Sequence, residues 1–184
     1  MSLVAISGNA SGTGTLTIAA PNTNSNYTLN LPAAAGTVMV SGNMPAFSAY
    51  QSSAQTLSGG VATKITFTTE EFDTNSNYDT TTSRFTPTVA GYYQVNACVT
   101  FANATAAEQN RTQIYKNGAQ AKIGNNATST VNQGATSVVS ALISMNGSTD
   151  YLEVYLFATG LGGTTPTNAI AGATYFQASM VRGA

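Results

Sequence analysis

Apolar and polar residues alternate along much of this chain, and no run has the spacing of an amphipathic helix. In the segment 150–158, three aliphatic residues would point to one side of a strand, and Glu153 and Tyr155 to the other. The three aliphatic residues are Leu152, Val154 and Leu156. After Gly91, one side would carry Tyr93, Val95 and Ala97, and the other Gln94, Asn96 and Cys98. The pattern therefore predicts strands with one side in a core and a polar or aromatic second side.

Eight strand-like runs are expected in the body of the chain. They are Phe47–Tyr50, Val61–Thr68, Arg84–Thr86, Gly91–Phe101, Glu108–Lys116, Ser137–Met145, Tyr151–Ala158 and Thr174–Val181. Clusters of glycine, asparagine or proline separate them, as in Lys116-Asn117-Gly118 and Asn146-Gly147. Short strands with regular turn signals predict an all-β fold, either a β-sandwich or a jelly roll.

The first part of the chain differs from the rest in charge. The first charged side chain is Lys64, and the body is expected to begin near Met44-Pro45. We therefore divide the chain into an uncharged arm, residues 1–43, and a body, residues 44–184.

Two alternating runs of the arm, Gly14–Ala19 and Tyr27–Leu31, predict a short β-hairpin. One side of this hairpin would carry Leu16, Ile18, Leu29 and Leu31. An isolated hairpin is marginally stable in water, so this apolar side needs a partner. The partner is either another protein, joined by strand addition to an edge without charges, or the body of the same chain.

The chain is poor in charge. Charged residues make up 7% of it, against about 25% in typical domains, and the net charge is −1. This composition is typical of extracellular and viral β-proteins, and it argues against binding to nucleic acid or to an anionic membrane. No run approaches the roughly 20 apolar residues that span a bilayer, and the N-terminus lacks the pattern of a signal peptide. We expect assembly in a host cytoplasm and release by lysis.

Candidate chemistry is sparse. The chain has no histidine, so it lacks the usual general base and the common zinc ligand, and we expect neither an enzyme nor a cofactor. The single cysteine, Cys98, rules out an intrachain disulfide and is expected to be a small buried residue. Two of the acids Glu70, Glu71, Asp73 and Asp79 could in principle serve a glycosidase, although such acids in a polar loop are usually solvated.

A weak metal candidate lies in the same region. Asp73, Asn75, Asn77 and Asp79 alternate in a way that could offer several oxygens to calcium. The alternative is that these side chains cap turns, as Asp and Asn commonly do.

The body resembles the complement 1q-like globular head, a relative of the tumour necrosis factor fold. The matching features follow the family's order over about 140 residues. They are Ala46–Ala49, Ile65–Phe67, Glu71–Asp73, Asn77–Asp79, Arg84–Pro87, Ala90–Tyr93, Tyr115–Gly118, Asp150–Val154 and Tyr175-Phe176.

This resemblance implies a ten-stranded jelly roll that assembles as a homotrimer about a threefold axis. Carried over by position, Tyr93, Val95 and Phe176 are implied to be core residues. The predicted core also contains Phe67, Phe85, Leu152, Val154 and Leu156. The residues implied to face the trimer axis are Gln94, Asn96, Tyr155, Tyr175 and Gln177.

The arm resembles a segment of tailed-bacteriophage structural proteins that precedes a variable outer domain. The resemblance covers residues 14–38, from Gly-Thr-Leu-Thr-Ile-Ala-Ala-Pro to the Gly-Thr-Val at its end. Together, arm and body suggest a virion-surface protein. One possibility is a capsid decoration or cement protein attached by residues 1–43 to the major capsid protein. The other is a tail-fibre or tail-tip receptor-binding protein, attached to a tail protein, that recognises a host-surface glycan. The short arm favours the first, since receptor-binding tail proteins generally need a shaft.

Overall fold

The structure is a computed structural model that describes residues 7–8, 10–19, 21–30, 33, 35–36, 38–104, 109–128, 133–161 and 165–184. The chain divides into two units, Met1–Gly36 and Thr37–Ala184. The expected boundary after residue 43 therefore lies within the second unit. There the amide of Asn43 donates to the Val40 carbonyl (2.9 Å), and the side-chain amide of Asn75 donates to the Gly42 carbonyl (3.1 Å). The second of these bonds joins the last residues of the predicted arm to the body.

The described part of the second unit consists of strands and one short 3-10 turn, η1 (Ser41–Asn43). One sheet has the order β10 (Gln133–Met145), β7 (Gly91–Ala104), β13 (Tyr175–Gly183), β1 (Ala46–Tyr50) and β4 (Thr69–Asp73). A second has the order β5 (Tyr78–Asp79), β6 (Arg84–Phe85), β11 (Leu152–Thr159), β8 (Gln109–Lys116) and β9 (Ala119–Ile123), with β3 (Ala62–Lys64) also paired to β11. A small third sheet joins β2 (Thr56–Leu57) and β12 (Thr165–Pro166).

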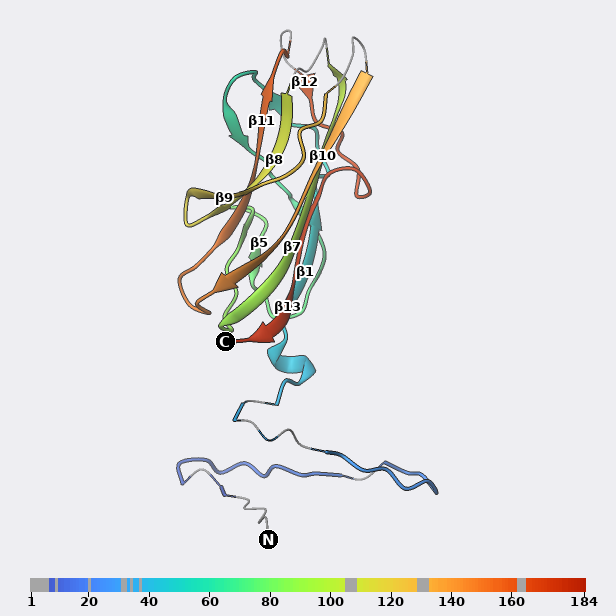
Figure 1. Cartoon of the computed structure of the whole chain (residues 1–184), viewed down its shortest axis with the longest axis vertical. Coiled ribbons are helices and arrows are strands. Elements are labelled where there is room, and N and C mark those ends of the chain that lie inside the picture. The colour runs from blue at the N-terminus through green and yellow to red at the C-terminus, as the bar shows by residue number, and fades with distance from the viewer. Residues whose placement is uncertain are drawn as a thin grey trace. The chain divides into compact units, whose positions relative to one another are not determined.

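The two large sheets form a sandwich in which every recorded strand pair is antiparallel. Figure 1 shows β10, β7, β13 and β1 side by side, with β11 and β8 in the other layer. The prediction of an all-β sandwich is confirmed. No helix in the described residues is long and apolar enough to cross a membrane.

Each of the eight predicted runs contains a strand, but two longer strands were not predicted. β4 contains Glu70 and Glu71, so its sequence is typical of a polar loop, and all five residues of β9 are exposed. Both lie at sheet edges, where a strand needs backbone partners but little apolar burial. The turn before β9 has the expected Asn-Gly chemistry, because Asn117 and Gly118 both have positive φ (54° and 77°).

The predicted arm hairpin is not formed in the described residues of the first unit, none of which belongs to a strand. Leu16, Ile18 and Leu29 are 87%, 83% and 86% exposed, and Leu31 lies outside the described residues. The physical reason is that an isolated hairpin is only marginally stable in water. Two short strands whose apolar side is not covered by another surface bury too little area to stay paired.

Aromatic side chains from both sheets meet at the centre of the sandwich. The ring of Phe47 in β1 stacks on Tyr78 (4.7 Å between centroids) and Phe85 (4.4 Å), and meets Phe176 edge-on (4.9 Å). All eight predicted core residues are at most 1% exposed: Phe67, Phe85, Tyr93, Val95, Leu152, Val154, Leu156 and Phe176. Phe47 therefore links strands of both sheets.

Replacing Phe47 with alanine should destabilise the body by about 3–5 kcal/mol, because it leaves a cavity between the sheets. Equilibrium unfolding of the full chain in urea, followed by circular dichroism, measures this change. The matched control is Tyr27→Ala in the first unit, where the ring is 77% exposed and the free energy of unfolding should change by less than about 0.5 kcal/mol. Similar losses in both variants would contradict the role given to Phe47.

Candidate functional site

Four of the five residues predicted to face a trimer axis lie together on the solvent side of the five-stranded sheet, which we call the assembly face. Gln94 and Asn96 belong to β7, and Tyr175 and Gln177 to the neighbouring β13. Gln177 is the register partner of Asn96. The alternation in β7 brings these side chains to one side, because Tyr93 and Val95 are fully buried on the other.

The polar side chains of the assembly face are bonded to one another. The Gln94 amide donates to the Ser140 hydroxyl (2.9 Å), which donates in turn to the Asn96 carbonyl oxygen (2.8 Å). The Gln177 amide donates to the Ser48 hydroxyl (3.1 Å). Because these groups already have partners, covering them with another protein costs less than covering free amides.

Charge is nearly absent from four of the five strands of this sheet. β1, β7 and β10 contain no charged residue, and β13 contains only Arg182. The acids are on the edge strand β4, where the Glu71 carboxylate accepts a hydrogen bond from Ser48 (2.5 Å). A large neutral sheet surface is suited to protein contact, since interface cores are depleted of charged residues.

Several apolar side chains on the assembly face were missed by the sequence reasoning. Tyr92, Val138, Leu142 and Val181 are 41%, 47%, 54% and 58% exposed. A signal existed in the strand Ser137–Met145, because adjacent apolar residues at 138–139 and 141–143 must place some of them outside the core. These side chains give the face apolar area that a partner could cover.

Cys98 also belongs to this side of β7, in register with Val138 on one side and Tyr175 on the other. It is 5% exposed, so the expectation of a buried cysteine matches its position. Burial raises the pKa of the Cys98 thiol and that of the Tyr175 hydroxyl. A thiol of raised pKa is a poor nucleophile at neutral pH.

Tyr155 does not join the other four predicted residues. It lies on β11, on the solvent side of the six-stranded sheet, where its ring stacks on Tyr115 (3.9 Å between centroids). The alternation within β11 was read correctly, but alternation alone does not say to which sheet a strand belongs.

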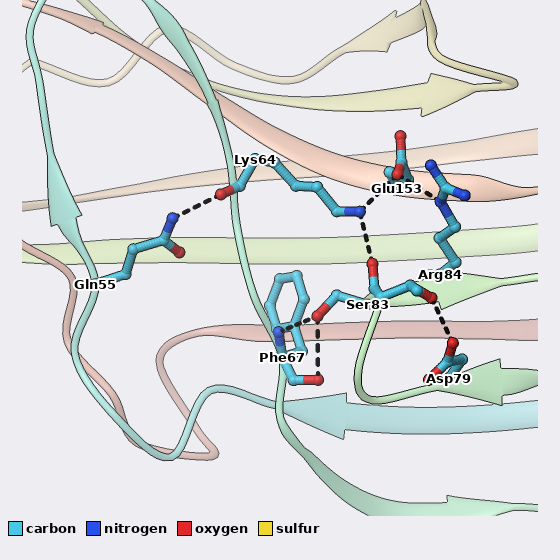
Figure 2. A network of polar contacts seen from close by, with 8 residues as sticks. Gln55, Lys64, Phe67, Asp79, Ser83, Arg84 and Glu153 are labelled. Carbon is cyan, nitrogen blue, oxygen red and sulfur yellow. Dashed lines mark hydrogen bonds and ion pairs between the residues drawn. The ribbon is translucent and has the colours of Figure 1, made fainter.

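An ion cluster lies beside this tyrosine pair, because Glu153 is the register partner of Tyr115 and Lys64 that of Tyr155. Figure 2 shows the charged side chains of this cluster. Glu153, 2% exposed, receives hydrogen bonds from Lys64 Nζ (2.6 Å) and Arg84 Nε (2.8 Å). Burial alone would raise the pKa of the Glu153 carboxyl, but the hydrogen bonds from Lys64 and Arg84 outweigh it and hold the pKa below its ordinary value. The three side chains tie β3, β6 and β11 together.

The predicted metal candidates are engaged in turns. The two carboxylate oxygens of Asp73 accept hydrogen bonds from the backbone amides of Asn75 (3.2 Å) and Tyr78 (2.7 Å). Asp79 accepts hydrogen bonds from Thr81 and Thr82, and these lower its pKa to about 2. Asn75 and Asn77 are also bonded within the region. The described residues contain no group of three or more metal-ligating side chains, and the arrangement favours turn capping.

The chain matches no protein-family model and no curated protein sequence. Several solved structures share its fold. The globular domain of zebrafish complement 1qA matches 76% of this chain and 99% of its own length, with 14% identity and a TM-score of 0.53. Murine APRIL at pH 8.0 matches 75% and 99%, with 6% identity and a TM-score of 0.53. Eiger TNF from S. frugiperda matches 77% and 93%, with 8% identity and a TM-score of 0.52.

At identities this low, the likeness shows a shared fold. The body is a jelly roll of the complement 1q and tumour necrosis factor type, as its sequence motifs predicted. The bacteriophage resemblance of the arm stays a prediction.

Replacing Glu153 with glutamine should destabilise the body by roughly 1–3 kcal/mol at neutral pH, because Lys64 and Arg84 lose their carboxylate while remaining partly solvated. The folded-state pKa of Glu153 is lowered, so its stabilisation is present above the ordinary value of 4.5 and is lost as the pH falls below it. Urea unfolding of both proteins at a series of pH values should therefore show the difference shrinking below about pH 4.5. A difference independent of pH would contradict the ionic role of Glu153.

Proposed function

We propose that this chain is a bacteriophage virion structural protein: a homotrimeric capsid decoration protein whose knob, the second unit, assembles through the assembly face and whose N-terminal arm attaches it to the major capsid protein. The observation that carries the proposal is the combination of a neutral, partly apolar sheet face with an exposed, uncharged arm. An interaction role fits this surface better than catalysis, since the acids of the 70–79 region are used in an edge strand and in turns.

The assembly face has the properties of a subunit interface. Its apolar side chains offer area to bury, and its amides and hydroxyls are already bonded to one another. A shallow depression of about 180 Å³ beside Phe72, Asn96 and Gln177 could accept a side chain of a neighbouring copy. The fold shared with complement 1q and tumour necrosis factor-like proteins supports a threefold arrangement as the form of assembly.

The properties of the arm support a role in attachment to another protein and not an independently folded arm. Its alternating runs carry exposed leucine and isoleucine side chains and no charge that would oppose strand addition. Addition of such a run to the sheet edge of a larger protein would satisfy its backbone groups and cover its apolar side. The resemblance of residues 14–38 to tailed-phage structural proteins makes a virion the proposed site of attachment.

A tail-fibre or tail-tip protein that recognises host glycan is the second candidate. The tyrosine pair Tyr115 and Tyr155 on the solvent side of the other sheet favours it, because partly exposed aromatic rings are suited to stacking on sugars. Copy number distinguishes the two: quantitative mass spectrometry of purified particles should find hundreds of copies of a decoration protein, but at most a few dozen of a tail protein.

The full chain should have a solution mass of three times 18.8 kDa, and Gln177→Arg should reduce it to the monomer. The arginine places an unpaired charge in the middle strand of the assembly face, where covering it is costly. Multi-angle light scattering measures the mass, and circular dichroism checks that the variant is folded.

The control for this substitution is Gln120→Arg, which adds the same side chain to the exposed strand β9 of the other sheet. It should remain trimeric. A wild-type monomer at micromolar concentration, or equal effects of the two substitutions, would refute assembly through this face.

Deletion of residues 1–36 should leave a folded knob that no longer co-sediments with phage particles, because the attaching segment is lost. A sharper pair is Leu29→Asp and Asn30→Asp, which add the same carboxylate to opposite sides of one alternating run. Only Leu29→Asp should weaken attachment, as measured by quantitative immunoblotting of sedimented particles. Undiminished attachment of the deletion variant would exclude the arm as the anchor.

A further inference from the structure

The solvent side of the six-stranded sheet carries an aromatic surface next to fixed cations. Tyr115 and Tyr155 stack on each other, with 24° between their ring planes. Nearby, the guanidinium of Arg84 lies 4.2 Å from the centroid of the Tyr151 ring. The three tyrosines are partly exposed, so their rings combine a rigid position with accessible area.

The position of Arg84 is fixed from two sides. Its Nε donates to the buried carboxylate of Glu153 (Figure 2). Its guanidinium group also lies over the ring of Tyr151. Lys64 shares the same carboxylate and also donates to the Thr82 carbonyl (2.6 Å). A ligand that binds here therefore meets side chains that have already lost much of their conformational freedom.

A third cation, Arg111, lies beside the tyrosine pair. It is the register partner of Phe157, and therefore lies diagonally across from Tyr155 on the same side of the sheet. Its recorded hydrogen bond goes to the neutral side chain of Gln109 (3.0 Å), and no carboxylate pairs with it among the described residues.

Charge on this side is unbalanced. Lys64, Arg84 and Arg111 carry three positive charges, while Glu153 and Asp79, the register partner of Arg84, carry two negative charges, leaving a local excess of one. The whole chain has a net charge of −1, and five of its six basic residues lie on strands of this sheet. The five are Lys64, Arg84, Arg111, Lys116 and Lys122.

From these observations we infer that this surface, which we call the tyrosine–arginine platform (Tyr115, Tyr151, Tyr155, Arg84 and Arg111), binds an acidic carbohydrate. The rings of Tyr115 and Tyr155 would stack on the apolar face of a sugar. The forked donors of Arg111 would bind its carboxylate or phosphate, a geometry that arginine matches in bidentate fashion.

One further group supports a ligand that carries hydroxyls. Gln113, the register partner of Tyr155, is 5% exposed, and its Oε1 has no hydrogen-bond partner. A buried acceptor without a donor is unfavourable, and a sugar hydroxyl can supply the donor.

The inference does not depend on trimer formation or on attachment to a capsid. All the residues of the platform belong to one copy of the chain and to the sheet opposite the assembly face. Among the described residues of the strands β1, β7, β10 and β13, Arg182 is the single basic residue, so the cation cluster is a feature of the other sheet.

Isothermal titration calorimetry of the full chain tests the inference with four probes of known structure. Tetragalacturonic acid supplies sugar carboxylates, glucose 6-phosphate a sugar phosphate, cellotetraose a neutral sugar chain, and tripolyphosphate an anion without a sugar. We expect at least one acidic sugar to bind, and cellotetraose to bind more weakly than that sugar. Tripolyphosphate carries more charge than the acidic sugars, so charge alone would make it bind more tightly; because it has no sugar ring to stack on the tyrosines, we expect it to bind less tightly than its charge predicts.

Two variants and one control assign the binding to the platform. Arg111→Gln and Tyr155→Leu should each weaken binding of the acidic sugar about tenfold or more, because they remove the anion partner and the stacking ring. Lys122→Gln removes a positive charge from the exposed strand β9 of the same sheet and should change the affinity less than about twofold. Circular dichroism and light scattering of each variant separate lost binding from lost folding or assembly.

Three results would overturn the inference. The first is no binding of either acidic sugar. The second is equal affinity for cellotetraose and tetragalacturonic acid, since the cations would then contribute nothing. The third is equal weakening by Arg111→Gln and Lys122→Gln with no effect of Tyr155→Leu, which is the behaviour of unspecific ion adsorption. A monomeric protein that still binds the acidic sugar would refute the trimer proposal and leave the platform intact.

Discussion

The packing of aromatic rings between the two sheets is the interaction on which the rest of this structure depends. Phe47 and Phe176 come from the five-stranded sheet, and Tyr78 and Phe85 from the short strands of the other. Few charged groups are available to join the layers, and the Glu153 cluster ties strands within one sheet only. Burial of these rings therefore supplies the cohesion between sheets. Because these buried rings hold the sheets together, the side chains on the two outer surfaces are not needed for cohesion between the sheets and can differ in polarity and charge.

The two outer surfaces have different physical characters. The assembly face combines bonded amides and hydroxyls with exposed aliphatic side chains, and three of its strands carry no charge. The opposite sheet carries stacked tyrosines on its solvent side, and five of the six basic residues lie on its strands. Neutral surfaces are suited to permanent contact with another subunit, whereas charged aromatic surfaces are suited to polar ligands. This difference between the two surfaces is what the two proposals, assembly through one sheet and ligand binding by the other, are based on.

The first unit illustrates how local pattern and stability can diverge. Its alternating runs have the composition of strands, yet the described residues form none, and their apolar side chains remain exposed. Two short strands cannot bury enough area to offset the loss of conformational entropy on pairing. Exposed apolar side chains on an unpaired segment are consistent with the proposed role of this segment in attachment.

The sequence by itself determined the fold class and the strands that alternate strongly, because period-two alternation requires one side of a strand to be buried. Alternation gave a common side to Leu152, Val154 and Leu156, whereas the resemblance to the complement 1q-like head implied the core position of Phe176; all of them are buried. The family resemblance implied that Gln94, Asn96, Tyr155, Tyr175 and Gln177 face one axis, and all of these except Tyr155 share one sheet surface. Only the tertiary structure decided that Tyr155 belongs to the opposite surface, that β4 and β9 complete the sheet edges, and that Asp73 and Asp79 hold turns. Strand order, edge pairing and side-chain hydrogen bonds depend on contacts between distant parts of the chain, and local alternation carries no information about them.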